Sequence, residues 1–172
     1  VMENIILIGF MGCGKTTVGK KLASMSGRKF LDMDDEIVRR AGMKITEIFE
    51  KYGEDRFRQM ETELCEQLSE TEGLVIATGG GVIKNERNMQ LLRKSGKTLY
   101  IKASAEHIYR NIKNDRTRPL LNCYDKMGRI RELLEERRPL YESESDVITD
   151  ISGLSSSAAA NKIYEVLTKE AE

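Results

Sequence analysis

A glycine-rich segment near the start of this 172-residue chain indicates its fold class: Gly9-Phe10-Met11-Gly12-Cys13-Gly14-Lys15-Thr16. It matches the whole of the pattern GxxxxGK[ST], in which a glycine-rich turn follows a strand and opens a helix. The apolar run 4–8 precedes it, and a helical pattern over 15–26 follows it. Glycines in such a turn let successive backbone N–H groups face one anion, and the helix N-terminus adds its dipole. The stretch therefore predicts a site for a nucleoside triphosphate.

The motif's own side chains and the lack of GTPase signatures elsewhere indicate which nucleotide binds. Lys15 supplies a point charge for the β- and γ-phosphates, and the Thr16 hydroxyl can ligate Mg²⁺. A GTPase would carry Asn-Lys-x-Asp, but the nearest segment, Asn161-Lys162-Ile163-Tyr164, lacks the aspartate. The apolar run 74–78 ends in Gly79 and not in the aspartate of a Walker B strand. We therefore interpret the nucleotide as ATP and the chain as a small kinase, and not as a GTPase, a motor or a switch protein.

Short apolar runs alternate with amphipathic stretches along the whole chain. We expect strands at 4–8, 29–33, 74–78, 98–102 and 146–149, and helices near 15–26, 34–41, 54–70, 85–95, 104–113, 126–142 and 156–170. This alternation is typical of a parallel α/β sheet with helices on both faces. No linker or repeat divides the sequence, so residues 1–172 are expected to form one domain. Only 114–125 is polar and irregular, which makes it a candidate mobile loop.

Composition excludes several function classes. The 28 Lys and Arg residues balance 28 Asp and Glu, so bulk charge would not attract nucleic acid or an anionic membrane. The three cysteines are far apart and lack metal-ligand spacing, which favours a reducing compartment. No apolar run is long enough to span a bilayer. We expect a cytoplasmic protein that binds neither nucleic acid nor membrane.

Three acids stand at the end of the second expected strand, in Asp32-Met33-Asp34-Asp35. Ligands bind at this edge of an open parallel sheet, and strand alternation would point Asp32 and Asp34 to one side. We assign Asp34 to the hydroxyl that accepts a phosphoryl group and Asp32 to the metal. Alternatively, Asp34 or Asp35 caps the helix that follows.

Arginines and glycines farther along the chain could hold a second anion. Arg58 and Glu61 are three residues apart on one helix face, so Glu61 could orient the guanidinium toward a carboxylate. They could equally form an ordinary surface pair. Gly79–Gly81 would let a ligand approach the backbone and offer it free N–H groups; the alternative is a bare flexible turn, although one glycine would serve for that.

The segment 107–120 is locally positive and includes Arg116 and Arg118. These arginines could belong to a lid that closes on the transferred phosphoryl group, or to a solvated helix end. Both prolines lie in Arg-Pro-Leu tripeptides, at Pro119 and Pro139, where each is expected to stop or stiffen the backbone. The single histidine, His107, is expected at the surface.

Six segments, in order and at matching separations, carry a resemblance to a known family. They are GFMGCGKTT from Gly9, DMDDEI from Asp32, FRQMETE from Phe57, ATGGGV from Ala77, RTRPLL from Arg116 and ERRPLY from Glu136. Together they resemble shikimate kinases from about residue 4 to residue 168. This resemblance implies a three-layer α/β/α P-loop kinase fold with strand order 2-3-1-4-5 and a mobile lid at about 112–125. It implies transfer of the γ-phosphoryl group of ATP, with Mg²⁺, to the 3-hydroxyl of shikimate.

The resemblance also implies the site. ATP phosphates would contact Gly12, Cys13, Gly14, Lys15, Thr16 and Thr17; shikimate would contact Asp34, Arg58, Gly79, Gly80, Gly81 and Arg137. Residues 34–70 would form the shikimate-binding region. Arg118 would stabilise charge on the transferred group from the lid. Adenine would lie between the segment 152–157 and either Arg110 or, in its place, Asn111.

Two other functions stay open at this point. The chain could be another small-molecule P-loop kinase, acting on gluconate or a nucleoside monophosphate, although Arg58, Arg137 and the triple glycine suit a carboxylate better. It could also be a sensor that binds ATP or shikimate without catalysis, although Lys15, Asp34 and Arg118 are all retained. We expect the chain to act as a monomer.

Overall fold

The structure is a computed structural model that describes residues 2–115 and 121–171. Its elements in chain order are β1 Asn4–Ile8, α1 Lys15–Ser26, β2 Lys29–Asp32, α2 Met33–Ala41, α3 Ile45–Tyr52, α4 Glu54–Leu68, β3 Leu74–Ala77, the 3-10 helix η1 Val82–Lys84, α5 Glu86–Arg93, β4 Gly96–Lys102, α6 Ala105–Ile112, α7 Lys126–Glu144, β5 Val147–Asp150 and α8 Ser156–Ala171. All five expected strands are present to within two residues at either end.

The five strands form one parallel sheet in the order β2-β3-β1-β4-β5. β1 lies at its centre, where Ile6 is opposite Ile76 of β3 on one side and Thr98 of β4 on the other. Every residue of β1 is buried, as expected for a strand covered on both faces. The predicted α/β class and strand order are confirmed. The carboxyl ends of all five strands therefore lie along one edge, where open sheets of this kind bind ligands.

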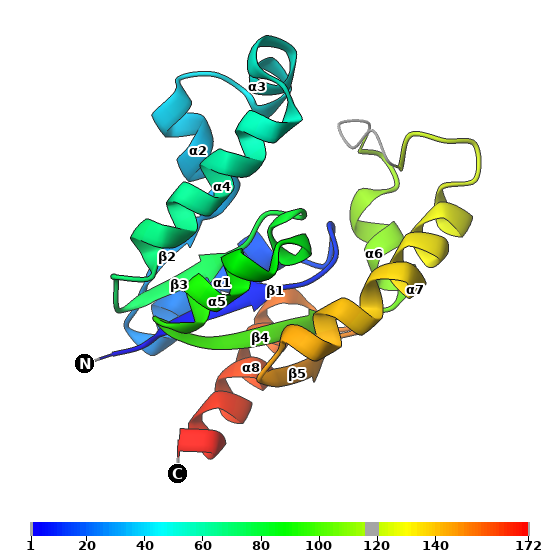
Figure 1. Cartoon of the computed structure of the whole chain (residues 1–172). Coiled ribbons are helices and arrows are strands. Elements are labelled where there is room, and N and C mark those ends of the chain that lie inside the picture. The colour runs from blue at the N-terminus through cyan, green and yellow to red at the C-terminus, as the bar shows by residue number, and fades with distance from the viewer. Residues whose placement is uncertain (1, 116–120, 172) are drawn as a thin grey trace.

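Helices cover both faces of the sheet (Figure 1). α1 and α8 pack against each other, while α5 and α7 pack against β4. α7 is joined to β4 by Tyr141 and Tyr100, whose rings stack with centroids 5.1 Å apart. In Figure 1 the helices α2–α4 and the pair α6 and α7 rise on two sides of the molecule, away from both termini.

The region between residues 34 and 70 differs from the expected pattern. It contains three helices, because α3 lies between the two that were predicted. α2 ends at Ala41 and is capped by Gly42, whose φ of +69° is the left-handed conformation that glycine tolerates at helix ends. The short η1 helix after the triple glycine was also not predicted.

The observed ends of β2 and α7 place two candidate residues in a different secondary structure from the one expected. β2 ends at Asp32 and α2 begins at Met33, so Asp34 lies in the first turn of a helix and not on a strand. Pro139 lies inside α7, which continues to Glu144 instead of stopping there. Within the described residues, no helix is long and apolar enough to cross a lipid bilayer.

Candidate active site

The glycine-rich turn connects β1 to α1 in the way the motif predicts. Gly12 and Gly14 have φ of +80° and +101°, conformations that residues with a side chain rarely adopt. Lys15 folds back over the turn, and its Nζ donates to the Gly9 carbonyl at 2.5 Å. Cys13 is 1% exposed, and its backbone N–H donates to the Phe10 carbonyl. The ammonium of Lys15 is thus held at the turn by the carbonyls of Gly9 and Phe10.

A cavity of about 470 Å³ opens in front of this turn. It is lined by Met11, Gly12, Gly14, Lys15, Thr16, Thr17, Asp32, Asp34, Thr78, Gly80, Asn111, Ile112, Asp115 and Ser156. Its polar lining, the helix N-terminus and Lys15 suit a polyphosphate. Cys13 is absent from the lining because its thiol is buried under the turn. We refer to this space as the phosphate cavity.

Asp32 connects the phosphate cavity to helix α2. Its Oδ1 accepts from the Asp35 backbone N–H at 3.1 Å and caps α2, so the cap is neither Asp34 nor Asp35. Its Oδ2 accepts from the Thr16 hydroxyl at 2.9 Å. Two oxygen groups of this kind fit Mg²⁺, which is commonly held by one or two protein oxygens together with substrate phosphates. The described residues contain no group of three or more acidic, cysteine or histidine side chains that could hold a metal alone.

Asp34 is left without a capping role and lies half-buried between two cavities. Burial raises the pKa of its carboxyl, and the neighbouring Asp32 raises it further, while Lys15 and Arg58 act in the opposite direction. A carboxylate poised in this way can accept the proton or hydrogen bond of a hydroxyl.

The second cavity, of about 210 Å³, shares Met11, Asp34 and Gly80 with the first. Its other lining residues are Ile45, Phe57, Arg58, Glu61, Gly81, Lys84 and Arg137. Three of these are cations, Arg58, Lys84 and Arg137, so a small anion fits this space. We refer to it as the acceptor cavity.

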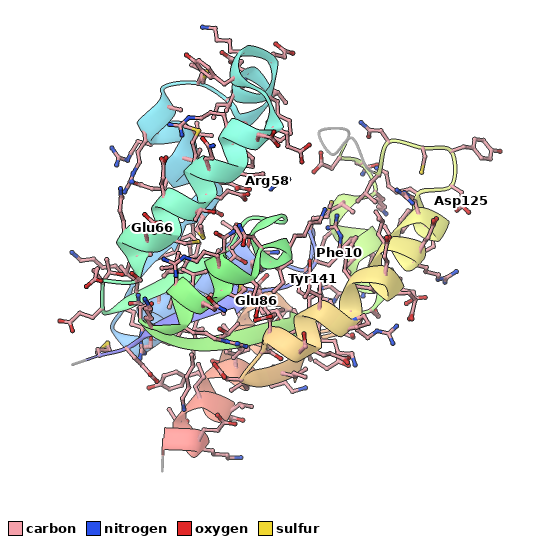
Figure 2. The ribbon with its side chains drawn as sticks, viewed as in Figure 1. Phe10, Arg58, Glu66, Glu86, Asp125 and Tyr141 are labelled. Carbon is pink, nitrogen blue, oxygen red and sulfur yellow. The ribbon has the colours of Figure 1, made fainter. Side chains whose placement is uncertain are left out.

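Arg58 is held in place by two acids of α4. Its Nη1 donates to Glu61 at 2.7 Å, and its Nη2 donates to Glu54 at 3.2 Å. Glu61 is 1% exposed, and burial raises its pKa while Arg58 lowers it. Figure 2 shows Arg58 on the side of α4 that faces α6 and α7. The Arg58–Glu61 pair is therefore a built feature of the cavity and not an ordinary surface pair.

Arg137 approaches the acceptor cavity from the other side, on α7. Its guanidinium lies 5.7 Å from the centroid of the Phe10 ring, in a cation–π contact. Arg58 and Arg137 come from helices that are far apart in sequence, and the fold brings both to one small space.

Comparison with known proteins agrees with this geometry. The family model described as "Shikimate kinase" matches residues 11–168. The chain belongs to the shikimate kinase family. The shikimate kinase of Caldicellulosiruptor bescii is 44% identical over 173 residues, covering 99% of both chains. That of Thermodesulfovibrio yellowstonii is 45% identical, covering 95% of this chain and 94% of its own.

Solved structures of the family have the same fold. The shikimate kinase of Acinetobacter baumannii, solved in complex with shikimate, has a TM-score of 0.90 at 38% identity and covers 99% of this chain and 95% of its own. That of Aquifex aeolicus has a TM-score of 0.82 at 37% identity, with 98% of each chain covered. The family consists of ATP-dependent kinases, so the nucleotide is ATP.

Most of the site residues expected from the resemblance line one of the two cavities, but some of them do not. Gly79 lines neither cavity and lies beside Asp34 instead. Arg110 is exposed and does not line the phosphate cavity, whereas Asn111 does and donates to the Gly12 carbonyl at 2.8 Å. Arg118 lies outside the described residues.

Some site residues were missed from the sequence. Met11 and Lys84 line the acceptor cavity, and Thr78 lines the phosphate cavity. Their positions next to the glycine motifs were the available signal. Ser156, which also lines the phosphate cavity, belongs to the segment 152–157 that was expected beside the adenine. His107 was expected at the surface, and this was wrong, because it is only 8% exposed.

In this shikimate kinase family member, substitutions of Gly79 and Gly81 are expected to have different kinetic effects. A Cβ on Gly79 would lie 2.5 Å from an Asp34 oxygen, and one on Gly81 would overlap the Arg58 guanidinium. Gly79→Ala should therefore lower kcat, and Gly81→Ala should raise KM for the acceptor, each by about 10-fold or more, since sub-ångström placement matters at such sites. Steady-state kinetics on both variants check this. Wild-type kcat and KM in both would show that the glycines only form a turn.

Proposed function

We propose that this chain transfers the γ-phosphoryl group of ATP to the 3-hydroxyl of shikimate, giving shikimate 3-phosphate and ADP on the route to chorismate and the aromatic amino acids. The observation that carries the proposal is the position of Asp34, which lines both the phosphate cavity and the acceptor cavity. A hydroxyl bound in the acceptor cavity beside Asp34 would face a γ-phosphate held by the glycine-rich turn. The related Acinetobacter baumannii enzyme was solved with shikimate, which supports this choice of acceptor.

On the nucleotide side, phosphoryl transfer needs positioning and charge stabilisation more than covalent chemistry by the protein. The backbone N–H groups of the turn would bind the phosphate oxygens. Lys15, which now donates to the Gly9 carbonyl, would turn its ammonium to the β- and γ-phosphates. Thr16 and Asp32 would hold Mg²⁺, which supplies positive charge to the phosphate oxygens when it is bound.

On the acceptor side, the carboxylate of shikimate would lie between Arg58 and Arg137. Glu61 fixes the Arg58 guanidinium, so little side-chain entropy is lost when the carboxylate binds. Backbone groups of Gly80 and Gly81 would contact the ring hydroxyls. Asp34 would orient the 3-hydroxyl and accept its proton as the oxygen attacks the γ-phosphorus.

The remaining assignments belong to the same proposal. Arg118, in a lid at about 112–125, would stabilise charge on the transferred group. The adenine would lie near Arg110 or Asn111, and the geometry at Asn111 favours the latter. We further propose that residues 1–172 act as one domain and as a monomer, which light scattering during gel filtration would test.

A panel of acceptors tests the proposed function. With Mg·ATP, the coupled release of ADP should be fast with shikimate and remain at the background rate with gluconate, CMP and AMP. The acceptor cavity of about 210 Å³ offers three cations for one carboxylate and is small for a nucleotide, which is the reason for this order. Turnover with gluconate or a nucleotide, and none with shikimate, would overturn the proposal.

A further inference from the structure

His107 is the only histidine of the chain, and the mechanism above does not use it. It lies in the first turn of α6 and is 8% exposed. Its ring nitrogen Nδ1 accepts a hydrogen bond from the backbone N–H of Gly153 at 3.0 Å. A backbone N–H can only donate, so this bond requires an imidazole whose Nδ1 carries no proton.

The bond from Gly153 belongs to a small network between α6 and the loop that joins β5 to α8. The backbone N–H of Ser104 donates to the Ser152 hydroxyl oxygen at 2.8 Å. The Ser104 hydroxyl in turn accepts from the backbone N–H of His107 at 3.2 Å. Ser152 donates to the Asp150 carboxylate through both its backbone N–H and its hydroxyl. The start of α6 and the residues 150–153 are thus fastened to each other at two points.

This network adjoins the phosphate cavity. Ser156, three residues after Gly153, lines that cavity at the start of α8. On α6, Asn111 also lines it and donates to the Gly12 carbonyl of the glycine-rich turn. Ser104, His107 and Asn111 follow one another at spacings of three and four, which places them on one face of the helix. One face of α6 therefore joins the β5–α8 loop to the phosphate-binding turn.

We propose that His107 is a positioning residue for the nucleotide: by accepting the Gly153 N–H, it holds the β5–α8 loop, and with it Ser156, in the position that forms the wall of the phosphate cavity. The inference rests on the proposed function in taking this cavity as the ATP side of the site. His107 acts through the loop and contacts no reacting atom.

Protonation of His107 removes the acceptor that the loop needs. Nδ1 would then carry a hydrogen facing the Gly153 N–H, and two donors repel. Burial lowers the pKa of His107, Arg110 on the same helix lowers it further, and Asp150 at the end of β5 raises it. From α8, Lys162 donates to the Asp150 carbonyl. Nucleotide affinity should therefore fall as pH drops through this lowered pKa, and thus at a lower pH than the ordinary histidine value of 6.5.

Two substitutions at residue 107 distinguish the effect of the hydrogen-bond acceptor from the effect of the positive charge. His107→Asn keeps an oxygen near the position of Nδ1 but does not titrate, and His107→Leu keeps bulk without an acceptor. Calorimetric titration of the full chain with Mg·ADP from pH 5.5 to 8 should show weaker binding by wild type at low pH. His107→Asn should bind as wild type at pH 7.5 and should bind more tightly than wild type at low pH, because it does not titrate. His107→Leu should bind about 5-fold more weakly than wild type at pH 7.5, the usual worth of one hydrogen bond, and this difference should shrink at low pH.

Controls distinguish a positioning role of His107 from a nonspecific loss of structure. Glu106→Gln, on the exposed neighbour that pairs with Arg131, should leave Mg·ADP binding unchanged. The ratio of wild type to His107→Asn cancels titration of the nucleotide phosphates. Nitrogen-15 NMR of the single imidazole should show Nδ1 unprotonated at pH 7.5, a readout that needs no substitution.

Wild-type affinity in His107→Leu at pH 7.5, a ratio of wild-type to His107→Asn affinity that does not change with pH, or a protonated Nδ1 at pH 7.5 would each overturn the inference. If His107→Leu fails to fold, the Asn variant and the NMR measurement still decide. Failure of the proposed function would show separately, as absence of shikimate phosphorylation by wild type, because Mg·ADP binding and the imidazole signal require no acceptor.

Discussion

Asp34→Asn is expected to lower kcat by about 10²–10⁴-fold, the usual contribution of a positioned general base. Asp34 lies where the phosphate and acceptor cavities meet, so its carboxylate is placed to take the proton of the attacking hydroxyl. Asparagine has nearly the same size and can orient a hydroxyl but cannot accept a proton. Steady-state kinetics at saturating ATP and shikimate measure the effect, with circular dichroism to show that the fold persists.

The neighbouring Asp35 provides a matched control. It lies in the same turn of α2, is exposed, and lines neither cavity. Asp35→Asn should therefore keep kcat within about 2-fold of wild type, as surface substitutions usually do. Equal kcat in Asp34→Asn and Asp35→Asn would remove Asp34 from catalysis.

The pH dependence follows from the same carboxyl group. Burial, and then the charge of Asp32, raises the pKa of Asp34 above its ordinary value of 3.8. Since the ionised form is the active base, kcat should fall as pH drops through this raised pKa, and therefore at higher pH than for a free aspartate. Saturating ATP removes the separate contribution of His107 to nucleotide affinity. An acid limb in Asp34→Asn identical to that of wild type would assign the limb to another group.

Arg58→Ala is expected to reduce kcat/KM for shikimate by about 100-fold or more, because loss of one partner of a buried charge contact costs about 2–5 kcal/mol. Arg58 lines the acceptor cavity and does not line the phosphate cavity. KM for ATP should therefore change little. Kinetics with each substrate varied in turn give both constants.

Arg56→Ala is the control for this change. Arg56 lies on the same helix, pairs with the exposed Glu63, and lines neither cavity. It should leave both KM values near those of wild type. An unchanged KM for shikimate in Arg58→Ala would remove Arg58 from the site.

Stability should also fall in Arg58→Ala, for a reason separate from substrate binding. Glu61 is 1% exposed, and its Oε2 has no hydrogen-bond partner among the described residues. Without Arg58 its Oε1 would lose a partner as well, at a cost of about 1–3 kcal/mol. Arg58→Lys keeps a positive charge for Glu61 but loses the planar fork, so it should restore stability more than it restores the KM for shikimate.

The parts of the site formed by consecutive residues could be predicted from the sequence. The phosphate-binding turn depends on glycines and on one strand and one helix that adjoin it, and the structure has these in place. The strand order followed from the resemblance to shikimate kinases and is confirmed. The polar ends of β2 and β3 meet because parallel strands share their carboxyl edge.

Features that depend on contacts distant in sequence could not be predicted. His107 accepts a hydrogen bond from a residue 46 positions later, and Asn111 donates to a residue 99 positions earlier. The alternative that Asp34 or Asp35 caps α2 was wrong, because β2 ends one residue earlier than its apolar pattern indicates and Asp32 is the cap. α3 was not predicted because a short helix between two glycines shows too few turns of hydrophobic periodicity.

Two adjoining cavities are proposed to hold ATP and shikimate, with Asp34 between them. Incubation of the full chain with shikimate and [γ-¹⁸O]ATP, followed by phosphorus-31 NMR and mass spectrometry, tests this arrangement through its product. We expect one phosphate ester on the 3-hydroxyl, carrying the labelled γ-phosphoryl group and equal in amount to the ADP formed. ADP with only labelled inorganic phosphate, or an ester on a different hydroxyl, would contradict it.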